Sequence, residues 1–161
     1  MKFSTQEEYG LRCLLRIGKS GEPNGLTIPE ISQMEGLSTA NVGKLLRILR
    51  LGGFIESTRG QTGGYKLARP AEEIIIGEVM AALGGRLFEA GFCSDHSGVE
   101  MICTHTIDCS IRSLWRTIQS LLDGVLEKLT LKDLIGSEEQ VNGIVSSFAD
   151  DVEIPLIKNW H

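Results

Sequence analysis

The first element that the pattern predicts is a helix from Ser4 to about Lys19. Ser4 and Glu7 have the S-x-x-E spacing of a capping box. Apolar side chains then recur three and four residues apart, the period of an amphipathic helix. The apolar positions are Leu11, Leu14, Leu15 and Ile17. A loop that contains glycine and proline follows over residues 20–25.

Two shorter helices joined by a tight turn are predicted next. Thr27 and Glu30 repeat the capping-box spacing, and Gly36 closes the helix that they open. Ser38 can cap the third helix, in which apolar and basic side chains alternate on two faces. The apolar positions are Val42, Leu45, Leu46 and Leu49, and the basic ones are Lys44, Arg47 and Arg50. This arrangement predicts a helix-turn-helix whose second helix enters the major groove of DNA.

The third helix is followed by a predicted β-hairpin. Residues 54–58 and 65–68 have strand patterns, and the glycine-rich segment 59–64 between them is typical of a hairpin tip. A helix-turn-helix followed by a hairpin predicts a winged helix. In that arrangement Arg59 can enter the minor groove, where narrow A/T tracts attract arginine.

The second half of the chain is less regular. After Pro70, residues 74–83 indicate a short helix, and 84–108 form an irregular stretch that carries three cysteines. From Ile111, apolar residues follow a near-heptad spacing for about five turns. They are Ile111, Leu114, Trp115, Ile118, Leu121, Leu122, Val125 and Leu129. Such a stripe is either core within the chain or the seam of a homodimer, and a chain of this size favours the second.

The sequence therefore predicts a mainly α fold with a small β-hairpin wing. Four segments are expected: a winged helix-turn-helix DNA-binding domain at 1–83, a cysteine-containing sensor loop at 84–110, a dimerisation helix at 111–136 and an acidic C-terminal tail at 137–161. The length of 161 residues suits one ordinary domain with an appendage. No signal pattern and no apolar run near the roughly 18 residues of a membrane span are present, so we expect a cytoplasmic protein without a membrane partner.

The charge is distributed unevenly along the chain. Residues 1–69 hold ten Lys/Arg against six Glu, whereas residues 70–161 hold six Lys/Arg against fifteen Asp/Glu. A basic front half is typical of a DNA-binding module joined to a separate sensing or dimerising part. The alternative is a chance asymmetry of a solvated surface, which charge alone does not exclude.

Three of the four cysteines lie close together in the sequence. Cys93, Cys103 and Cys109 fall within seventeen residues, which favours metal or redox chemistry over structural disulfides in a cytoplasmic protein. Cys13 lies among apolar positions of the first helix, where a buried, unreactive thiol is expected.

Several short motifs together resemble the IscR/NsrR-type (Rrf-two) family of winged-helix transcriptional regulators, over residues 1 to about 135. The carriers are Met1-Lys2-Phe3-Ser4, Ile31-Ser32, Gly36-Leu37-Ser38, Leu45 to Gly53, Arg59-Gly60, Gly63-Gly64-Tyr65, Gly77-Glu78-Val79, the three late cysteines and Leu114-Trp115. The resemblance implies a homodimer on a dyad-symmetric site in double-stranded promoter DNA. It also implies that Cys93, Cys103 and Cys109 hold a [2Fe-2S] or [4Fe-4S] cluster, for which thiolate is the required ligand.

The chain departs from the family pattern at three places. Nine residues separate Cys93 from Cys103, more than is usual in the family, and Arg112 stands where some members have a ligand histidine. Other members use a carboxylate from the partner subunit's first helix, and Glu8 occupies the matching position. His96 and His105 are further candidates for the fourth ligand. In the reading helix, Gly43 replaces a glutamate of some members.

The candidate DNA contacts lie on the third helix and the hairpin tip. They are Ser38, Thr39, Asn41, Lys44, Arg47, Arg59 and Gln61. Hydroxyl, amide and cationic side chains reach base edges or phosphates from such positions. Arg47 and Arg50 have the alternative roles of contacting phosphate without sequence preference or keeping the helix soluble.

The resulting hypothesis is a repressor whose promoter binding is controlled by an iron-sulfur cluster that responds to redox state, nitric oxide or iron. The alternative is a cluster-free regulator. It has a structural Cys3His zinc site made by Cys93, Cys103, His105 and Cys109, or a thiol-, ligand- or protein-based signal. No phosphate-binding glycine motif, nucleophile elbow or paired carboxylates indicate an enzyme. A protein-binding adaptor with a degenerate winged helix is the remaining rival.

Overall fold

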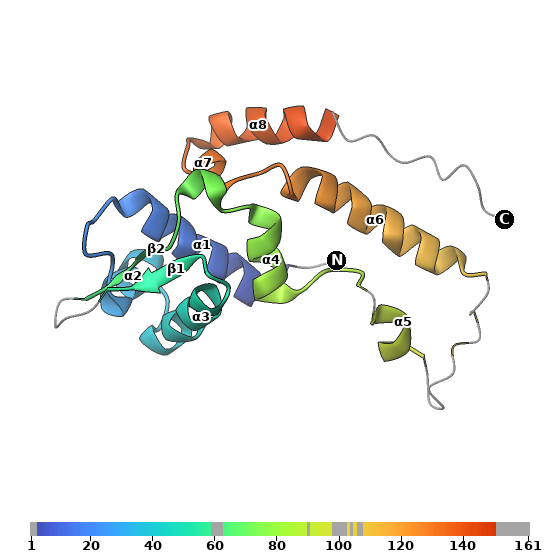
Figure 1. The fold of residues 1–161 in the computed structure, drawn as a ribbon, viewed down its shortest axis with the longest axis horizontal. Coiled ribbons are helices and arrows are strands. Elements are labelled where there is room, and N and C mark those ends of the chain that lie inside the picture. The colour runs from blue at the N-terminus through green and yellow to red at the C-terminus, as the bar shows by residue number, and fades with distance from the viewer. Residues whose placement is uncertain are drawn as a thin grey trace.

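The computed structural model in Figure 1 describes residues 3–58, 63–89, 91–97, 103, 105 and 108–150, with only the backbone of 149 and 150. The elements are α1 (Thr5–Ser20), α2 (Ile28–Glu35), α3 (Thr39–Leu51), β1 (Ile55–Ser57), β2 (Tyr65–Leu67), the 3-10 turn η1 (Ala71–Glu73), α4 (Ile76–Gly84), α5 (Phe92–Asp95), α6 (Ser110–Leu126), α7 (Leu131–Leu134) and α8 (Glu138–Asp150). The fold is mainly helical with one two-stranded antiparallel hairpin, as the sequence predicted.

The first three helices begin where their capping residues indicated. In α1 the Ser4 hydroxyl accepts a hydrogen bond from the Glu7 amide at 3.3 Å, and the Glu7 carboxylate accepts one from the Ser4 amide at 2.6 Å. Thr27 and Glu30 form the same reciprocal pair at the start of α2. These bonds satisfy amides that have no partner within the helix, which confirms the predicted helix starts.

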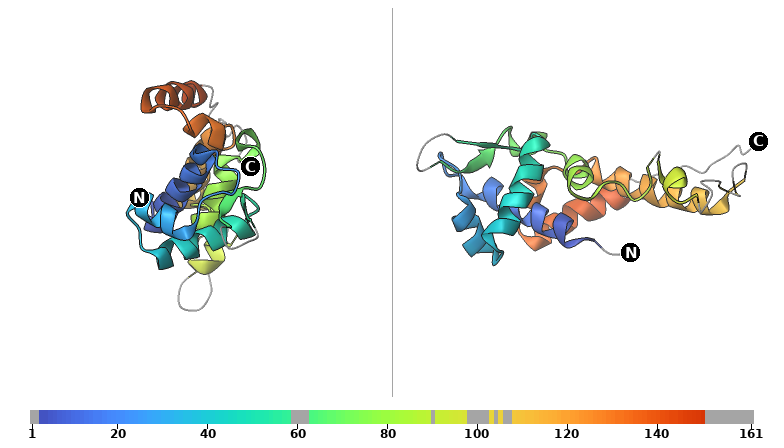
Figure 2. Two further views of the ribbon diagram at one scale, coloured as in Figure 1. Left: turned by 90° about the vertical axis from the view of Figure 1, so that its left-hand side faces the viewer. Right: turned by 90° about the horizontal axis from the view of Figure 1, so that it is seen from below.

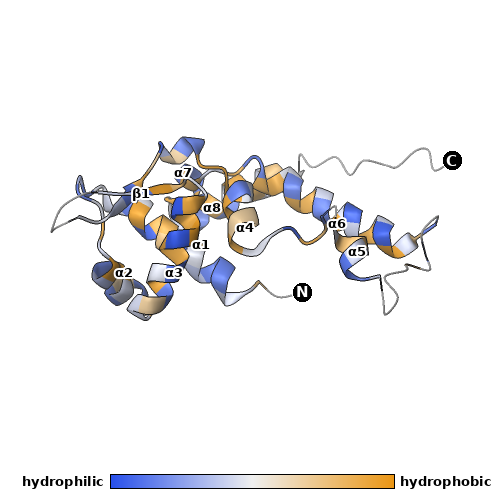
Figure 3. Ribbon diagram, turned by 60° about the horizontal axis from the view of Figure 1, so that its bottom comes forward, coloured by the Kyte–Doolittle hydropathy of each residue, from blue (hydrophilic) through white to orange (hydrophobic). Residues whose placement is uncertain are grey.

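The hydrophobic core forms around α1, which packs against both α3 and α4. Helices α1, α2, α3, α4 and α7 each contribute side chains with no measurable exposure. Examples, one from each helix, are Leu14, Ile31, Leu46, Val79 and Leu131. Coloured by hydropathy, the apolar stripes of α1 and α3 face the interior of this body (Figure 3). The amphipathic pattern of α1 and α3 in the sequence is therefore the pattern of the core.

Helix α6 extends away from this body. Figures 1 and 2 show an elongated molecule with the β-hairpin at one end and α5, followed by the start of α6, at the other. Helix α8 runs beside α6 and contacts it. The cysteine-containing segment is thus far from the hairpin within one chain, and it is connected to the core by α4 on one side and by α6 on the other.

The predicted helix 111–136 is shorter than expected. Helix α6 ends at Leu126, because the backbone that follows pairs with the segment before α4. The Ile76 amide donates to the Leu129 carbonyl and the Leu131 amide donates to the Ile74 carbonyl, each at 2.8 Å. A capping box of Thr130 and Asp133 then starts α7.

The segment 137–161, for which the sequence predicted only an acidic tail, contains α8 in its first part. Ser137 and Gln140 cap this helix: the Ser137 amide donates to the Gln140 side chain at 2.9 Å, and the Gln140 amide donates to the Ser137 hydroxyl at 3.3 Å. Ile144, Val145 and Phe148 pack against the core cluster. The helix therefore has an apolar face that the acidic composition concealed. Among the helices that the structure describes, none has the length and apolar character needed to cross a membrane.

Candidate functional site

The outer face of α3 carries the predicted base-reading residues. Ser38, Thr39, Lys44 and Arg47 are exposed and Asn41 is half-buried, whereas the four apolar positions of the helix are buried. Arg50 extends the same exposed face, and α3 contains no acidic residue. The arrangement presents a basic, polar helix surface of the kind that lies in a major groove.

The N-terminus of α3 is shaped for contact with an anion. The Ser38 hydroxyl accepts a hydrogen bond from the Asn41 amide at 3.2 Å, so Ser38 is the N-cap residue as predicted. The first amides of a helix carry partial positive charge and bind phosphate groups. Ser38 therefore combines a structural role with a position at the proposed DNA surface.

The two predicted contacts in the hairpin tip, Arg59 and Gln61, lie outside the described residues. At the base of the hairpin, Ile55 pairs with Leu67, Glu56 with Lys66 and Ser57 with Tyr65. A cross-strand ion pair of 3.2 Å joins the exposed side chains of Glu56 and Lys66.

The loop before α2 anchors the hairpin to the body. The Leu26 amide donates to the Tyr65 carbonyl at 2.9 Å, and the Tyr65 amide donates to the Leu26 carbonyl at 2.7 Å. The Thr58 hydroxyl donates to the Asn24 carbonyl at 2.8 Å. A Cβ on Gly64 would lie 2.7 Å from the Leu26 carbonyl carbon, so this close backbone approach requires glycine. The hairpin is thereby held at a set angle to the helix-turn-helix.

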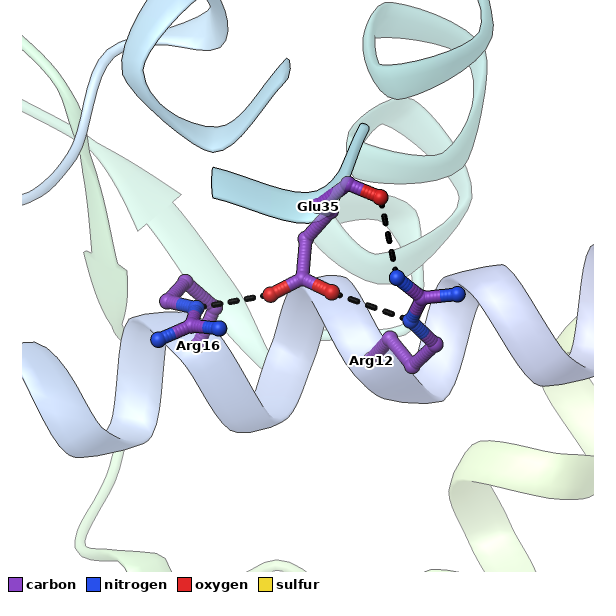
Figure 4. Close-up of polar contacts among 3 residues, drawn as sticks. All are labelled: Arg12, Arg16 and Glu35. Atoms are coloured by element: carbon purple, nitrogen blue, oxygen red, sulfur yellow. Dashed lines mark hydrogen bonds and ion pairs between the residues drawn. The ribbon is translucent and has the colours of Figure 1, made fainter. Parts of the chain in front are cut away.

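An ion-pair clamp, consisting of Arg12, Arg16 and Glu35, joins α1 to the end of α2 (Figure 4). Arg12 Nε donates to Glu35 Oε2 at 2.9 Å, and Arg16 Nε donates to Glu35 Oε1 at 2.6 Å. A terminal guanidinium nitrogen of Arg12 also donates to the Glu35 backbone carbonyl at 2.9 Å. The guanidinium of Arg12 lies over the Tyr9 ring, 5.6 Å from its centre. The clamp therefore fixes both the side chain and the backbone of Glu35.

The clamp determines the protonation of Glu35. Burial of the carboxyl group by itself raises its pKa, but the hydrogen bonds and charges of Arg16 and Arg12 outweigh burial and leave the pKa of Glu35 below 4.5. The carboxylate is therefore ionised at neutral pH, with both oxygens paired to arginine.

We expect the clamp to make stability depend on pH on the acid side. A carboxyl whose pKa is lowered by folding stabilises the folded state fully above its unfolded pKa of 4.5, and this contribution is lost as the pH falls through the lowered value. Thermal melts from pH 7 to pH 3 should show a shallower loss for Glu35→Gln than for the wild-type protein. Equal loss in the two proteins would contradict this expectation.

The three clustered cysteines lie on different parts of the segment between α4 and α6. Cys93 belongs to α5, Cys103 follows it, and Cys109 is the N-cap residue of α6. All three are free and half-buried. The Cys109 sulfur accepts a hydrogen bond from the Arg112 amide at 3.3 Å. A change in the chemistry of Cys109 would therefore act directly on the start of α6.

The described side chains do not form an assembled metal site. No three His, Cys, Asp or Glu residues come together as potential metal ligands within the part of the chain that the structure describes. That part includes Cys93, Cys103, His105 and Cys109, the set considered for zinc. His96 is already engaged, because its ring stacks on Phe92 and its Nδ1 lies 2.8 Å from the Phe92 carbonyl oxygen.

Glu8 lies on an exposed part of α1 and borders a groove between α1 and the α7–α8 region. Other residues of this groove include Leu15, Leu134 and Val145. The cysteines belong to a different part of the chain. The structure therefore does not bring Glu8 and the cysteines together within one chain.

Cys13 differs from the other cysteines in its surroundings. It is fully buried in α1, and burial, reinforced by the charge of Glu35, raises its pKa to about 11 despite the opposing charge of Arg12. The thiol is therefore protonated at neutral pH, which agrees with the unreactive role predicted for it.

We expect Cys93 and Cys109 to react with an alkylating reagent faster than the buried Cys13 does. When metal-free native protein is treated with iodoacetamide at pH 7, Cys93 and Cys109 should be alkylated well before Cys13, and mass spectrometry of peptides measures each site. All four should react after denaturation. Labelling of Cys13 as fast as Cys109 in the native protein would contradict the buried position of Cys13.

Comparisons with known proteins agree with the geometry. The Rrf2 family model, whose description is iron-dependent transcriptional regulator, matches residues 3–137. Protein Rrf2 of Nitratidesulfovibrio vulgaris is 36% identical over 135 residues, which are 84% of this chain and 87% of that protein. The HTH-type transcriptional regulator IscR of Escherichia coli is 29% identical over 139 residues, 86% of this chain and 83% of that protein.

A solved structure with the same fold is that of CymR, the global cysteine regulator of B. subtilis. It has a TM-score of 0.66 and 29% identity, covering 84% of this chain and 96% of the CymR chain. These relatives are regulators rather than enzymes, in agreement with the absence of enzyme motifs from the sequence. The exposed reading helix, the anchored hairpin and the match over residues 3–137 together show that the chain belongs to the Rrf2 family of transcriptional regulators.

Proposed function

We propose that this regulator is a homodimeric repressor whose binding to promoter DNA is controlled by an iron-sulfur cluster held by Cys93, Cys103 and Cys109. The observation that carries the proposal is the position of these free cysteines beside and at the start of α6, the helix that leads back to the DNA-binding body. The relation to IscR and the description of the Rrf2 family as iron-dependent support it.

The donor set suits the proposed group. Iron-sulfur clusters are bound by thiolates, and hydrogen bonds to sulfur tune their properties. The Arg112 amide supplies one such bond to Cys109. When bound, the cluster would supply redox chemistry that responds to oxidant, nitric oxide or iron supply. A bound cluster would join Cys93, Cys103 and Cys109, and we propose that the resulting arrangement of these residues beside α6 is the signal.

A series of contacts connects the cysteine segment to the reading helix α3. Gln119 of α6 accepts a hydrogen bond from the Phe88 amide at 3.0 Å and donates one to Asp123 at 2.8 Å, and Asp123 pairs with Arg86. The segment before α5 is therefore attached to α6. Helix α6 contacts α4, which packs against both α1 and α3.

We further propose that α6 forms the dimer seam. Ile111 and Leu114 on this helix are 58% and 53% exposed. Exposed apolar side chains at this spacing favour contact with a second copy, and a two-fold dimer suits paired half-sites on DNA. In such a dimer the partner's Glu8 is the proposed fourth ligand. On the DNA side, the proposed contacts are Ser38, Thr39, Asn41, Lys44, Arg47, Arg59 and Gln61.

The test is anaerobic purification followed by measurement of iron, sulfide and the visible absorption spectrum. We expect coloured protein containing both elements, and loss of both when Cys93, Cys103 or Cys109 is replaced by serine. Cys13→Ala is the matched control and should keep the cluster, because Cys13 is buried in the core. DNA footprints of loaded and metal-free protein should differ. Colourless protein after attempted reconstitution would contradict the cluster.

Two variants of Cys109 separate its two roles. Serine retains an acceptor for the Arg112 amide, whereas alanine removes it. Cys109→Ser should therefore lose the cluster but keep the helical content of α6, while Cys109→Ala should lose the cluster and fray the first turn. Loss of helical content in both variants alike would contradict the capping role.

A second candidate is control by the thiols themselves. Cys93, Cys103 and Cys109 are free and half-buried, and the chain resembles CymR, a cysteine regulator. Metal-free protein treated with diamide should then change its DNA affinity, with recovery on reduction. Mass spectrometry would identify the disulfide. Stoichiometric zinc in the purified protein would instead support a structural site made by Cys93, Cys103, His105 and Cys109.

A further inference from the structure

The clamp acts on the residue that leads directly into the reading helix. Glu35 is the last residue of α2, and only Gly36 and Leu37 separate it from Ser38, the N-cap residue of α3. Three peptide units, each spanning about 3.8 Å between Cα atoms, connect Glu35 to Ser38. A displacement of Glu35 is therefore transmitted to the start of α3 over a short length of backbone. The position of the first turn of α3 therefore depends on where the end of α2 is held.

The hydrogen bonds of Glu35 reach another helix, whereas the other hydrogen bonds around this turn stay within the helix-turn-helix. Within the helix-turn-helix, the Leu37 amide donates to the Ser32 carbonyl at 3.1 Å and the Ser32 hydroxyl donates to the Leu37 carbonyl. These bonds join α2 to its own turn. The Glu35 contacts instead join the turn to α1, which is the centre of the core. They give the helix-turn-helix a polar attachment to the body in addition to its apolar packing.

The clamp restrains the position of Glu35 relative to α1. Arg12 and Arg16 are four residues apart and so lie on one face of α1, and each directs its Nε to a different oxygen of Glu35. The Glu35 side chain is only 6% exposed, whereas the side chains of Arg12 and Arg16 are each 41% exposed, and both bonds to Glu35 are charge-assisted. The bond from Arg12 to the Glu35 carbonyl also occupies one of the last acceptors of α2.

We propose that Glu35 is a positioning residue for DNA reading, which sets the start of α3 relative to α1 through Arg12 and Arg16. The apolar core holds the domain folded without it, since α1 and α3 pack through buried leucines. Loss of the clamp therefore loosens the orientation of α3 within a folded protein. Base-edge contacts need accurate placement, whereas attraction to phosphates does not.

The test compares specific and non-specific DNA binding by Glu35→Gln. The probes are a duplex selected by the wild-type protein from a random-sequence pool and a duplex of unrelated sequence, both measured by fluorescence anisotropy well below the melting temperature. Glutamine has nearly the same shape but cannot form two charge-assisted bonds. We expect affinity for the selected duplex to fall about tenfold or more, and affinity for the unrelated duplex to stay equal or rise.

The control is Glu22→Gln, which makes the same change of charge in the exposed loop before α2. Removal of a negative charge by itself strengthens attraction to DNA, so this variant should not lose specific affinity. Arg16→Lys provides a second test that retains the charge but lacks the planar geometry of arginine, and it should lower the specific affinity in the same direction.

An unchanged ratio of specific to non-specific affinity in folded Glu35→Gln would overturn the proposal. If Glu35→Gln does not fold, the same ratio in Arg16→Lys decides the question. Failure of the wild-type protein to select any sequence would instead count against DNA reading by α3, a result that is distinct from failure of the clamp.

Discussion

Replacement of Gly64 by alanine is expected to disrupt the base of the hairpin, to lower the free energy of unfolding by about 1–3 kcal/mol and to weaken DNA binding. The added Cβ would lie 2.7 Å from the Leu26 carbonyl carbon and 2.8 Å from that of Gly25. Both neighbours are backbone atoms, which cannot rotate aside. Relief of the clash separates Tyr65 from Leu26 and redirects the tip that carries Arg59 and Gln61.

Denaturant unfolding and anisotropy with the selected duplex would measure the two effects of Gly64→Ala. Gly143→Ala is the control, because a Cβ at Gly143 in α8 meets no atom within 4 Å. Alanine in a helix interior is favoured over glycine by about 1 kcal/mol, so this variant should be as stable as the wild-type protein or more so. Wild-type stability and DNA affinity in Gly64→Ala would show that the hairpin base tolerates the displacement.

Replacement of Leu46 by alanine is expected to lower the free energy of unfolding by about 2–5 kcal/mol. Leu46 belongs to α3 and has no exposed surface, so the change removes buried methyl groups and leaves a cavity in the centre of the core. Domains of this size are stable by only about 5–15 kcal/mol, so a large part of the stability would be lost.

The same helix offers a matched control for this prediction. Leu51, at the end of α3, is 75% exposed, and its replacement by alanine should change the free energy of unfolding by less than about 0.5 kcal/mol. Thermal or urea unfolding of the two variants makes the comparison. Equal losses in Leu46→Ala and Leu51→Ala would be inconsistent with the orientation of α3 in this structure.

The DNA-binding half of the fold was predictable because its signals are local. The capping pairs Ser4–Glu7 and Thr27–Glu30 are three residues apart, and the structure forms both. The buried positions of α3 follow one helical period, so they could be identified without knowledge of their partners.

The second half was predicted less well because long-range contacts determine it. Leu129 continues the apolar spacing of α6, yet its carbonyl accepts a hydrogen bond from the Ile76 amide and the helix has already ended. A capping signal was present at Thr130 and Asp133, but the apolar period masked it. Helix α8 has a similar signal at Ser137, three residues before Gln140, within an acidic segment.

The candidate site shows the same division. The exposed face of α3 follows from periodicity, whereas the clamp joins residues 19 and 23 positions apart and is not visible in any local pattern. The cysteines are close in sequence but are not assembled in space among the described residues. Ligand assembly depends on the group to be bound, because metal binding and local folding are coupled.

The separation of α3 into a buried and an exposed face has a consequence for how regulators of this fold diverge. The side chains of Val42, Leu45 and Leu49 are buried in the core, whereas those of Thr39 and Lys44 are exposed. Surface substitutions usually change stability by less than about 0.5 kcal/mol. After gene duplication, one copy of the regulator can therefore come to recognise a different operator sequence through a few substitutions on this exposed face. The buried residues that hold α3 in the core stay unchanged.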